Sequence, residues 1–363
     1  MNANHRTHGI PAASPAPASS AHPAASAASA ALPSGEQGVL GAGQLRDHGL
    51  SAAAIAERCR PGGPWQQLLP QVYLLHPGPP TSRERVQAAL LYAGRDPGGH
   101  GPVGGGREAM VTGLAALALH GFCAVPPLPG LRRIDVLVPH HRRLRDADGV
   151  TLHRADELPR AQDVCGLPCA PVPRALADAV AALADAAVSG DTGAADTIRR
   201  ALGEAVLTGH CVGASVVREL AEAGLLDLLP VAAALPALEA ADRTMGEERL
   251  YALVRDHQLP DPMWNVELVL PGGPPLGGVD AYWPDQAVAA VVDARAASAG
   301  HDESSWARHA RQRDRLEALG IALLPLTPAR LAARPEQQAA VVRTALMAST
   351  DRTPAAYVVV IPR

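Results

Sequence analysis

The chain contains 363 residues, of which 47% are hydrophobic and only 3% are aromatic, and its net charge at pH 7 is −4. This length predicts two or three domains, and the slightly negative charge excludes a chain-wide basic field that would attract nucleic acid. All 32 basic residues are arginine, so no reaction here can use a lysine. The five scattered cysteines do not predict a disulfide framework. We expect no membrane span and a cytoplasmic location, because the sequence has neither a long apolar run nor an apolar signal core.

Residues 1–37 are rich in Ala, Ser and Pro and contain almost no large apolar side chain. Such a segment cannot bury enough surface to offset the entropy lost on ordering, so we expect it to be disordered.

Residues 38–80 predict a small module of helices and strands. A short helix over 41–48 ends at Gly49, and a second helix over 52–59 has Ser51 as its N-cap. Two short strands follow at 65–69 and 71–75. Helix, turn, helix and two-stranded ribbon is the order of a winged helix-turn-helix, in which the helix after Ser51 lies in the major groove.

The charge of this module gives little support to DNA binding by one copy. Its arginines are opposed by the acids Asp47 and Glu57, and few are present to contact phosphates. A small helical module that binds protein is therefore the alternative. If the module binds DNA, the candidate contact residues are Arg46, Ser51, Arg58, Arg60, Trp65 and Tyr73.

The middle region predicts helices and strands but contains no reactive constellation. Helices are expected at 81–93, 107–120, 173–183, 194–207, 214–223 and 231–240. Pro236 is expected to kink or end the last of these helices. The glycine-rich loop at 96–106 lacks the Gly-Lys-Ser/Thr of a phosphate loop. Strands are expected at 134–138 and 149–153, and the basic turn at 140–145 is interpreted as a solvated hairpin loop or a phosphate contact.

The stretch Gly277–Arg295 carries one acid on each of two apolar runs. Asp280 lies within the run 279–283, and Asp293 follows the run 287–292. An acid at the edge of an apolar strand is costly unless it binds a partner or a metal. Two acids on neighbouring strands could converge on one divalent cation, as metal-dependent phosphodiester cleavage requires. Alternatively, both acids face water or cap turns.

The elements around this stretch predict an α/β domain with a mixed sheet. We expect helices at 245–257, 303–319 and 337–347, and strands at 265–270, 279–283, 287–292 and 321–326. In the first helix, Glu247 shares a face with Leu250 and Leu253.

Residues 38–77 resemble the N-terminal winged helix of AbiEi-like antitoxins. The match consists of Gln44-Leu45, Gly49-Leu50-Ser51, Ile55, Trp65, Pro70 and Val72-Tyr73, with Gln71 in place of the family glycine in the ribbon turn. Residues 88–93, 115–121 and 174–178 look like the middle segment of the same proteins. The resemblance implies a DNA-binding transcription regulator that represses its own operon and opposes a nucleotidyltransferase toxin.

Residues from about 243 to 347 resemble the Vsr-like nuclease domain, which has a PD-(D/E)XK, restriction-endonuclease-like fold. The resemblance implies that Glu247, Asp280 and Asp293 are the catalytic acids and that Asp280 and Asp293 hold Mg²⁺. The family motif Glu-x-Asp-Gly is replaced by Val291-Val292-Asp293-Ala294, so valine stands at the position of a central glutamate ligand. In a later helix, Gln312 matches a family arginine. We interpret this domain as a nuclease fold with degenerate catalysis.

The predicted protein is thus an α+β multidomain chain. Its parts are a disordered tail (1–37), a winged helix-turn-helix (38–80), a middle region (81–242), a Vsr-like domain (243–349) and a C-terminal extension (350–363). The favoured function is a DNA-binding regulator, and the alternative is a Mg²⁺-dependent DNA endonuclease. A third hypothesis, an interaction protein that binds no nucleic acid, is supported by the near-neutral module at 38–80 and the net charge of −4.

Overall fold

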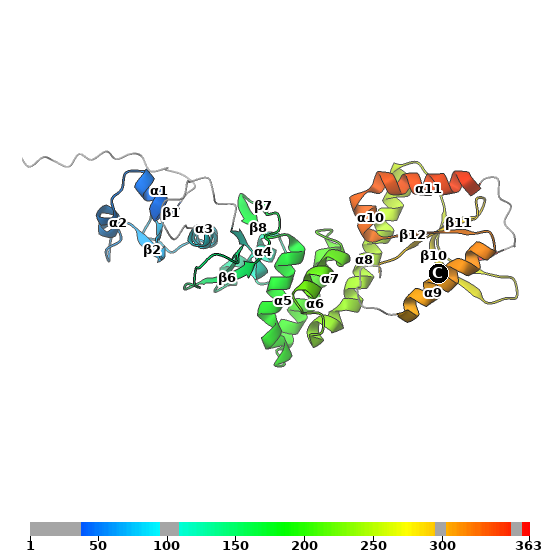
Figure 1. Cartoon of the computed structure of the whole chain (residues 1–363), viewed down its shortest axis with the longest axis horizontal. Coiled ribbons are helices and arrows are strands. Elements are labelled where there is room, and N and C mark those ends of the chain that lie inside the picture. The colour runs from blue at the N-terminus through cyan, green and yellow to red at the C-terminus, as the bar shows by residue number, and fades with distance from the viewer. Residues whose placement is uncertain (1–37, 95–108, 295–302, 350–357) are drawn as a thin grey trace, which may run out of the picture. The chain divides into compact units, whose positions relative to one another are not determined.

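The computed structural model describes residues 38–94, 109–294, 303–349 and 358–363. Within these residues helices alternate with strands, and the strands form three sheets, in agreement with the expected α+β class (Figure 1). The expected disordered tail and the glycine-rich loop at 96–106 lie outside the described residues. No helix in the described part of the chain is long and apolar enough to cross a membrane.

The first sheet is antiparallel and has the strand order β1-β3-β2. In chain order its elements are β1 (Val39–Gly41), α1 (Ala42–Asp47), α2 (Ala52–Arg58), β2 (Gln66–Leu69) and β3 (Val72–Leu74). Ser51 caps α2, because its Oγ accepts a hydrogen bond from the Ala54 N–H at 3.2 Å. The expected helices and ribbon strands are confirmed, and β1 adds a third strand that the sequence pattern did not predict.

Gln71 makes the ribbon turn without the glycine found in the resembling family. Its φ of 64° lies in the left-handed region, which costs a residue with a side chain about 1–2 kcal/mol. The Gln71 carbonyl accepts a hydrogen bond from the Ala42 N–H at 2.8 Å, so the start of α1 holds this turn in place. The turn therefore forms despite the substitution.

The second sheet has the order β6-β5-β4-β8-β7. It follows α3 (Ser82–Ala93), which begins at a capping box made by Thr81 and Glu84. The sheet region contains β4 (Met110–Val111), α4 (Gly113–Leu119), the 3₁₀ turn η2 (Leu128–Gly130), β5 (Ile134–Pro139), β6 (Val150–Ala155), β7 (Gln162–Val164) and β8 (Leu167–Cys169).

Two expectations for this region are wrong. The helix predicted over 107–120 is a strand followed by a shorter helix, because Met110 and Val111 are buried and pair with β5. Strands β5 and β6 are parallel, so the basic turn is not a hairpin. Residues 140–149 instead connect the end of β5 to the start of the parallel strand β6. In this connection Asp146 accepts a hydrogen bond from the Leu152 N–H at 3.0 Å.

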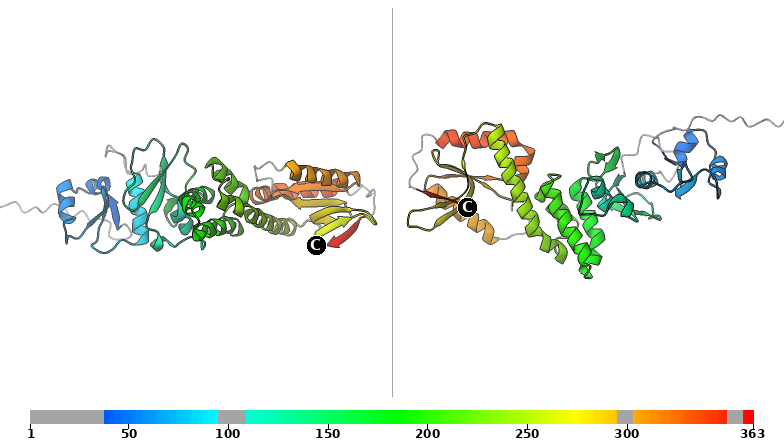
Figure 2. Two further views of the ribbon diagram at one scale, coloured as in Figure 1. Left: turned by 90° about the horizontal axis from the view of Figure 1, so that it is seen from below. Right: turned by 180° about the vertical axis from the view of Figure 1, so that it is seen from behind.

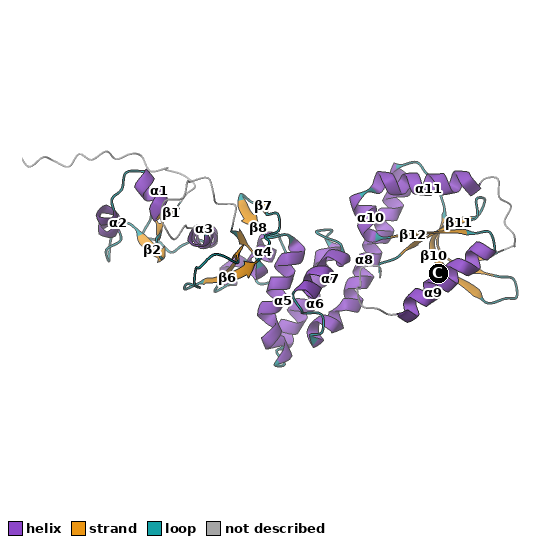
Figure 3. Ribbon diagram, viewed as in Figure 1, coloured by secondary structure: helices purple, strands orange, loops and turns teal. Residues whose placement is uncertain are grey.

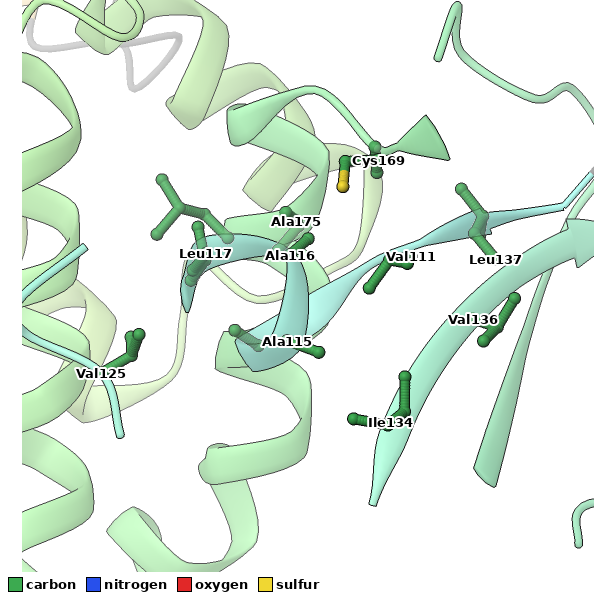
Figure 4. Packing of buried hydrophobic residues seen from close by; sticks show 14 of the residues in the cluster. Val111, Ala115, Ala116, Leu117, Val125, Ile134, Val136, Leu137, Cys169 and Ala175 are labelled. Atoms are coloured by element: carbon green, nitrogen blue, oxygen red, sulfur yellow. The ribbon is translucent and has the colours of Figure 1, made fainter. Parts of the chain in front are cut away.

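Small aliphatic side chains fill the core beside the second sheet. Figure 4 shows Val111 of β4 between α4, with Ala115 and Ala116, and Val136 of the neighbouring strand β5. Ala175 belongs to the same apolar cluster. All of these side chains are fully buried. A chain with few aromatics obtains a dense core in this way, because alanine lets helices and strands approach closely.

The chain between β8 and β9 contains only helices (Figure 3): α5 (Val172–Val188), α6 (Thr192–Leu207), α7 (Gly213–Glu222) and α8 (Leu229–Asp256). The expectation of separate helices at 231–240 and 245–257 is wrong, because α8 runs for 28 residues with Pro236 inside it. Its first half buries Val231, Ala234 and Leu238 in the same core as α6. This burial outweighs the roughly 3 kcal/mol that proline costs inside a helix.

The third sheet has the order β12-β11-β10-β9-β13 and is mixed, because only β11 and β12 run parallel. Its strands are β9 (Met263–Val269), β10 (Pro275–Trp283), β11 (Val288–Val292), β12 (Ala322–Leu326) and β13 (Val359–Pro362). Helix α9 (Glu303–Ala318) covers one face, and α10 (Pro328–Ala333) and α11 (Pro335–Ser349) cover the other together with the end of α8 (Figures 1 and 2). Residues 359–362, expected to extend beyond the domain, are an edge strand of this sheet.

Gly246 lets α8 lie directly on β11. A Cβ at this position would sit 2.5 Å from Val292 Cγ1 and 3.1 Å from Pro328 Cγ. We predict that Gly246→Ala destabilises the protein by about 1–3 kcal/mol in urea unfolding, because the branched valine and the proline ring cannot move aside.

Gly203→Ala is the matched control. Gly203 lies in α6 with no atom within 4 Å of an added Cβ. The control should stabilise the protein by up to about 1 kcal/mol through helix propensity. Equal effects of the two substitutions would contradict the tight α8–β11 contact.

Candidate functional site

Asp280 of β10 is a buried carboxylate with a partner on each oxygen. Its side chain is 2% exposed. Oδ1 accepts a hydrogen bond from Arg243 Nη2 at 2.5 Å, and Oδ2 accepts one from the Val292 N–H at 2.6 Å. The backbone pairing of β10 with β11 ends at Ala281 and Ala290. Beyond that point the Asp280 side chain supplies the acceptor that the neighbouring strand no longer provides.

Arg243 of α8 bridges Asp280 and Glu247. Its Nε donates to Glu247 Oε1 at 2.8 Å, while Nη2 binds Asp280. Arg243 and Glu247 are four residues apart, so they lie on one face of α8. The Arg243 side chain is 41% exposed and that of Glu247 is 26% exposed. Asp280 is therefore buried, whereas the side chains of Arg243 and Glu247 on α8 are partly accessible to solvent.

Asp293 and Val291 lie at the end of β11. The half-buried Asp293 donates its backbone N–H to the Leu326 carbonyl of β12 at 2.7 Å. Val291 packs against the apolar cluster on the α9 face of the sheet, whereas Val292 packs in the cluster on the α8 face. The structure thus brings Glu247 and Asp280 together through Arg243, and it places the Val291 side chain on the opposite face.

The α9 face carries a second candidate from the sequence, Gln312. Its Nε2 donates to the Gly278 carbonyl at 3.3 Å. A Cβ on Gly277 would lie 2.4 Å from the same nitrogen, so the glycine pair allows α9 to approach β10. This hydrogen bond of Gln312 is therefore to the backbone of β10 and not to Asp280, Asp293 or Glu247. Arg295 and His301 lie outside the described residues.

As they lie, the acids do not fit Mg²⁺, the ion implied by the resembling nuclease family. Both oxygens of Asp280 are committed, one to a guanidinium and one to a backbone N–H. Among the described residues, no group of three or more His, Cys, Asp or Glu side chains is arranged to hold a metal ion. The positive charge between Glu247 and Asp280 belongs to Arg243. Sequence reasoning missed this arginine, although its four-residue spacing from Glu247 was a usable signal.

Three of the six candidate DNA-contacting residues hold the first module together. Ser51 caps α2, as described above. Trp65 is 7% exposed and lies beneath Arg58, whose guanidinium carbon is 5.0 Å from the ring centre. Arg58 also donates to the Ala54 carbonyl at 3.2 Å. The contacts of Arg58 and Trp65 fix α2 against the start of the ribbon.

The other three candidates lie nearer the surface. Arg60 pairs with Glu57 at 2.6 Å, and Arg46 is exposed in the last turn of α1. Tyr73 is half-buried in β3, and burial, followed by the nearby Cys59, raises the pKa of its hydroxyl. The exposed residues of α2 are instead mostly small, namely Ala52, Ala53 and Ala56, and Glu57 is the charged one among them.

No protein-family model matches this chain, and a search of curated proteins finds no significant match.

We predict that the ion pairs of Arg243 with Glu247 and Asp280 stabilise the folded protein. Arg243→Met removes the charged partner of a carboxylate that remains buried, and this should lower the free energy of unfolding by about 1–3 kcal/mol. Urea denaturation of the purified variant measures the effect. Asp280→Asn in the same background should recover part of the loss, because the uncharged amide can still accept from Val292.

Arg255→Met is the control. Arg255 pairs with Asp256 on the solvent-exposed surface of the same helix, so its removal should leave the unfolding midpoint unchanged. If Arg243→Met also leaves the midpoint unchanged, the bridge does not stabilise the fold.

Proposed function

We propose that this chain is a DNA-binding regulatory protein of the AbiEi antitoxin-like type, with a Vsr-like C-terminal domain that no longer cleaves DNA. The observation that carries the DNA-binding part is the arrangement of α1, α2 and the β2–β3 ribbon, a winged helix-turn-helix order with a capped second helix. The exposed alanines of α2 support it, because small side chains let a helix backbone come close to base edges.

The available charge predicts modest affinity for each copy. Arg58 is stacked on Trp65, which leaves Arg46 and Arg60 as the exposed arginines of the module. Two phosphate contacts would give a slope of about −2 in a plot of log K against log salt concentration. Recognition then depends on the fit of α2 in the groove more than on charge.

The bridge made by Arg243 supports loss of cleavage in the C-terminal domain. Its guanidinium neutralises one of the two carboxylates that a metal would need. We also propose that the protein represses its own operon and so opposes a nucleotidyltransferase toxin. This part of the proposal is based on the family resemblance at 38–77. The proposed role of the C-terminal domain is that of a scaffold that contacts DNA or a partner.

DNA binding can be tested by fluorescence anisotropy with duplex DNA from upstream of the gene at low salt. Ala53→Glu places a negative charge on the outward face of α2 and should weaken binding at least about tenfold through repulsion of the phosphates. Ala233→Glu is the matched control, because Ala233 is also an exposed helical alanine but lies in α8. Absence of binding by the wild-type protein at about 50 mM salt would overturn the proposal.

The alternative function is a Mg²⁺-dependent DNA endonuclease. It is favoured by Glu247 of α8 and Asp280 of β10, which both contact Arg243, together with Asp293, a further acid that follows β11. Plasmid nicking with Mg²⁺ or Mn²⁺ distinguishes it, with Asp280→Ala as the inactive reference. We expect no difference between the wild type and Asp280→Ala. We also expect Val291→Glu alone to restore nothing, because this side chain lies on the α9 face.

A further inference from the structure

A cavity in the middle region is independent of both candidate sites. It has a volume of about 470 Å³, within the usual range for small-molecule sites. It is lined by Leu114, Leu131, Arg132, Arg133, Asp135, Thr151, His153, Ala181 and Ala182. These residues come from α4, from β5 and the segment before it, from β6, and from α5. The cavity therefore has apolar walls with a few polar groups from adjacent strands.

Most of the polar groups in the cavity are already held in place. His153 Nε2 lies 2.9 Å from Asp135 Oδ1, so the ionised carboxylate accepts and the imidazole Nε2–H donates. Arg133 donates from Nε to Thr151 Oγ1 at 2.9 Å and lies 3.8 Å from Asp146. The hydrogen bond to Asp135 raises the pKa of His153 and so favours its charged form. Each acid near the cavity is thus matched by a positive partner.

Arg132 is different, because its side chain makes no hydrogen bond or ion pair with any residue that the structure describes. The side chain is exposed, and it lines the cavity beside the apolar residues Leu114 and Leu131. Its backbone is fixed, since Arg85 donates to the Leu131 and Arg132 carbonyls at 2.6 and 3.2 Å. The cavity therefore carries one unmatched positive charge at its rim.

We propose that this cavity binds a small organic monoanion, a carboxylate on an apolar body, whose charge is met by Arg132. One unmatched cation favours a single negative charge, and the acid Asp135 in the lining disfavours a dianion. The side chains of Leu114, Leu131, Ala181 and Ala182 would contact the apolar body. This site goes beyond the proposed DNA-binding function and would give the protein a small-molecule ligand.

The experiment uses 8-anilinonaphthalene-1-sulfonate, a fluorescent aromatic monoanion, as the probe of the full-length protein. We expect saturable one-to-one binding with a dissociation constant of about 10–100 μM, the range for a ligand of this size. 1-Naphthoate, an aromatic carboxylate, should displace the probe. The uncharged N-phenyl-1-naphthylamine should bind at least about tenfold more weakly.

Two variants locate the probe. Arg132→Ala should weaken binding at least about tenfold, and Ala182→Phe should abolish it by filling the cavity. Both positions are exposed, and unchanged thermal unfolding shows that the fold is intact. Arg143→Ala is the matched control, because Arg143 is an exposed arginine of the same region that does not line the cavity. It should leave binding unchanged.

Several outcomes would overturn the proposal. They are the absence of saturable fluorescence, equal binding of the uncharged analogue, and binding that survives both Arg132→Ala and Ala182→Phe. Displacement by dianionic 1-naphthyl phosphate but not by 1-naphthoate would also contradict it, because the site would then select two negative charges.

Discussion

The contact of α8 with the third sheet depends on one interaction, in which the Arg243 guanidinium lies between Glu247 of α8 and Asp280 of β10. Asp280 is buried at the point where the β10–β11 ladder ends, and a carboxylate there needs a compensating positive charge. Asp280 also accepts a hydrogen bond from the Val292 N–H. One side chain therefore binds both the β11 backbone and, through Arg243, helix α8. Without Arg243, the carboxylates of Glu247 and Asp280 could attract a metal ion. With Arg243 between them, they form a structural ion-pair network.

Helix α8 positions this network because it belongs to two cores. Its first half packs with α6 in the larger apolar cluster, and its second half packs on the third sheet through Leu250 and Leu253. Between them Gly246 allows contact with β11, and Arg243 and Glu247 lie on either side of that contact in sequence. The ion-pair network is therefore placed by apolar packing and only then completed by charge.

Sequence patterns predicted most elements, because caps and turns are local signals. Ser51 caps α2 as the sequence predicts, and the helix expected at 81–93 is α3, which Thr81 caps. Tertiary packing decided the rest: Pro236 lies inside α8, β5 and β6 run parallel, and β13 joins the third sheet from beyond residues 350–357. For the candidate site, the sequence indicated the three acids. It could not show that Arg243 fills the space between two of them, because that depends on how α8 crosses β10.

Binding of Mn²⁺ to the wild type and to Arg243→Met, measured by electron paramagnetic resonance, tests the central claim most directly. If the guanidinium takes the place of a cation, the wild type should bind Mn²⁺ no more tightly than about 1 mM, the weak end of the range for carboxylate sites. Arg243→Met should bind it more tightly, and Arg243→Met with Glu247→Gln should lose the gain. Tight Mn²⁺ binding by the wild type that is abolished by Asp280→Asn would contradict the account.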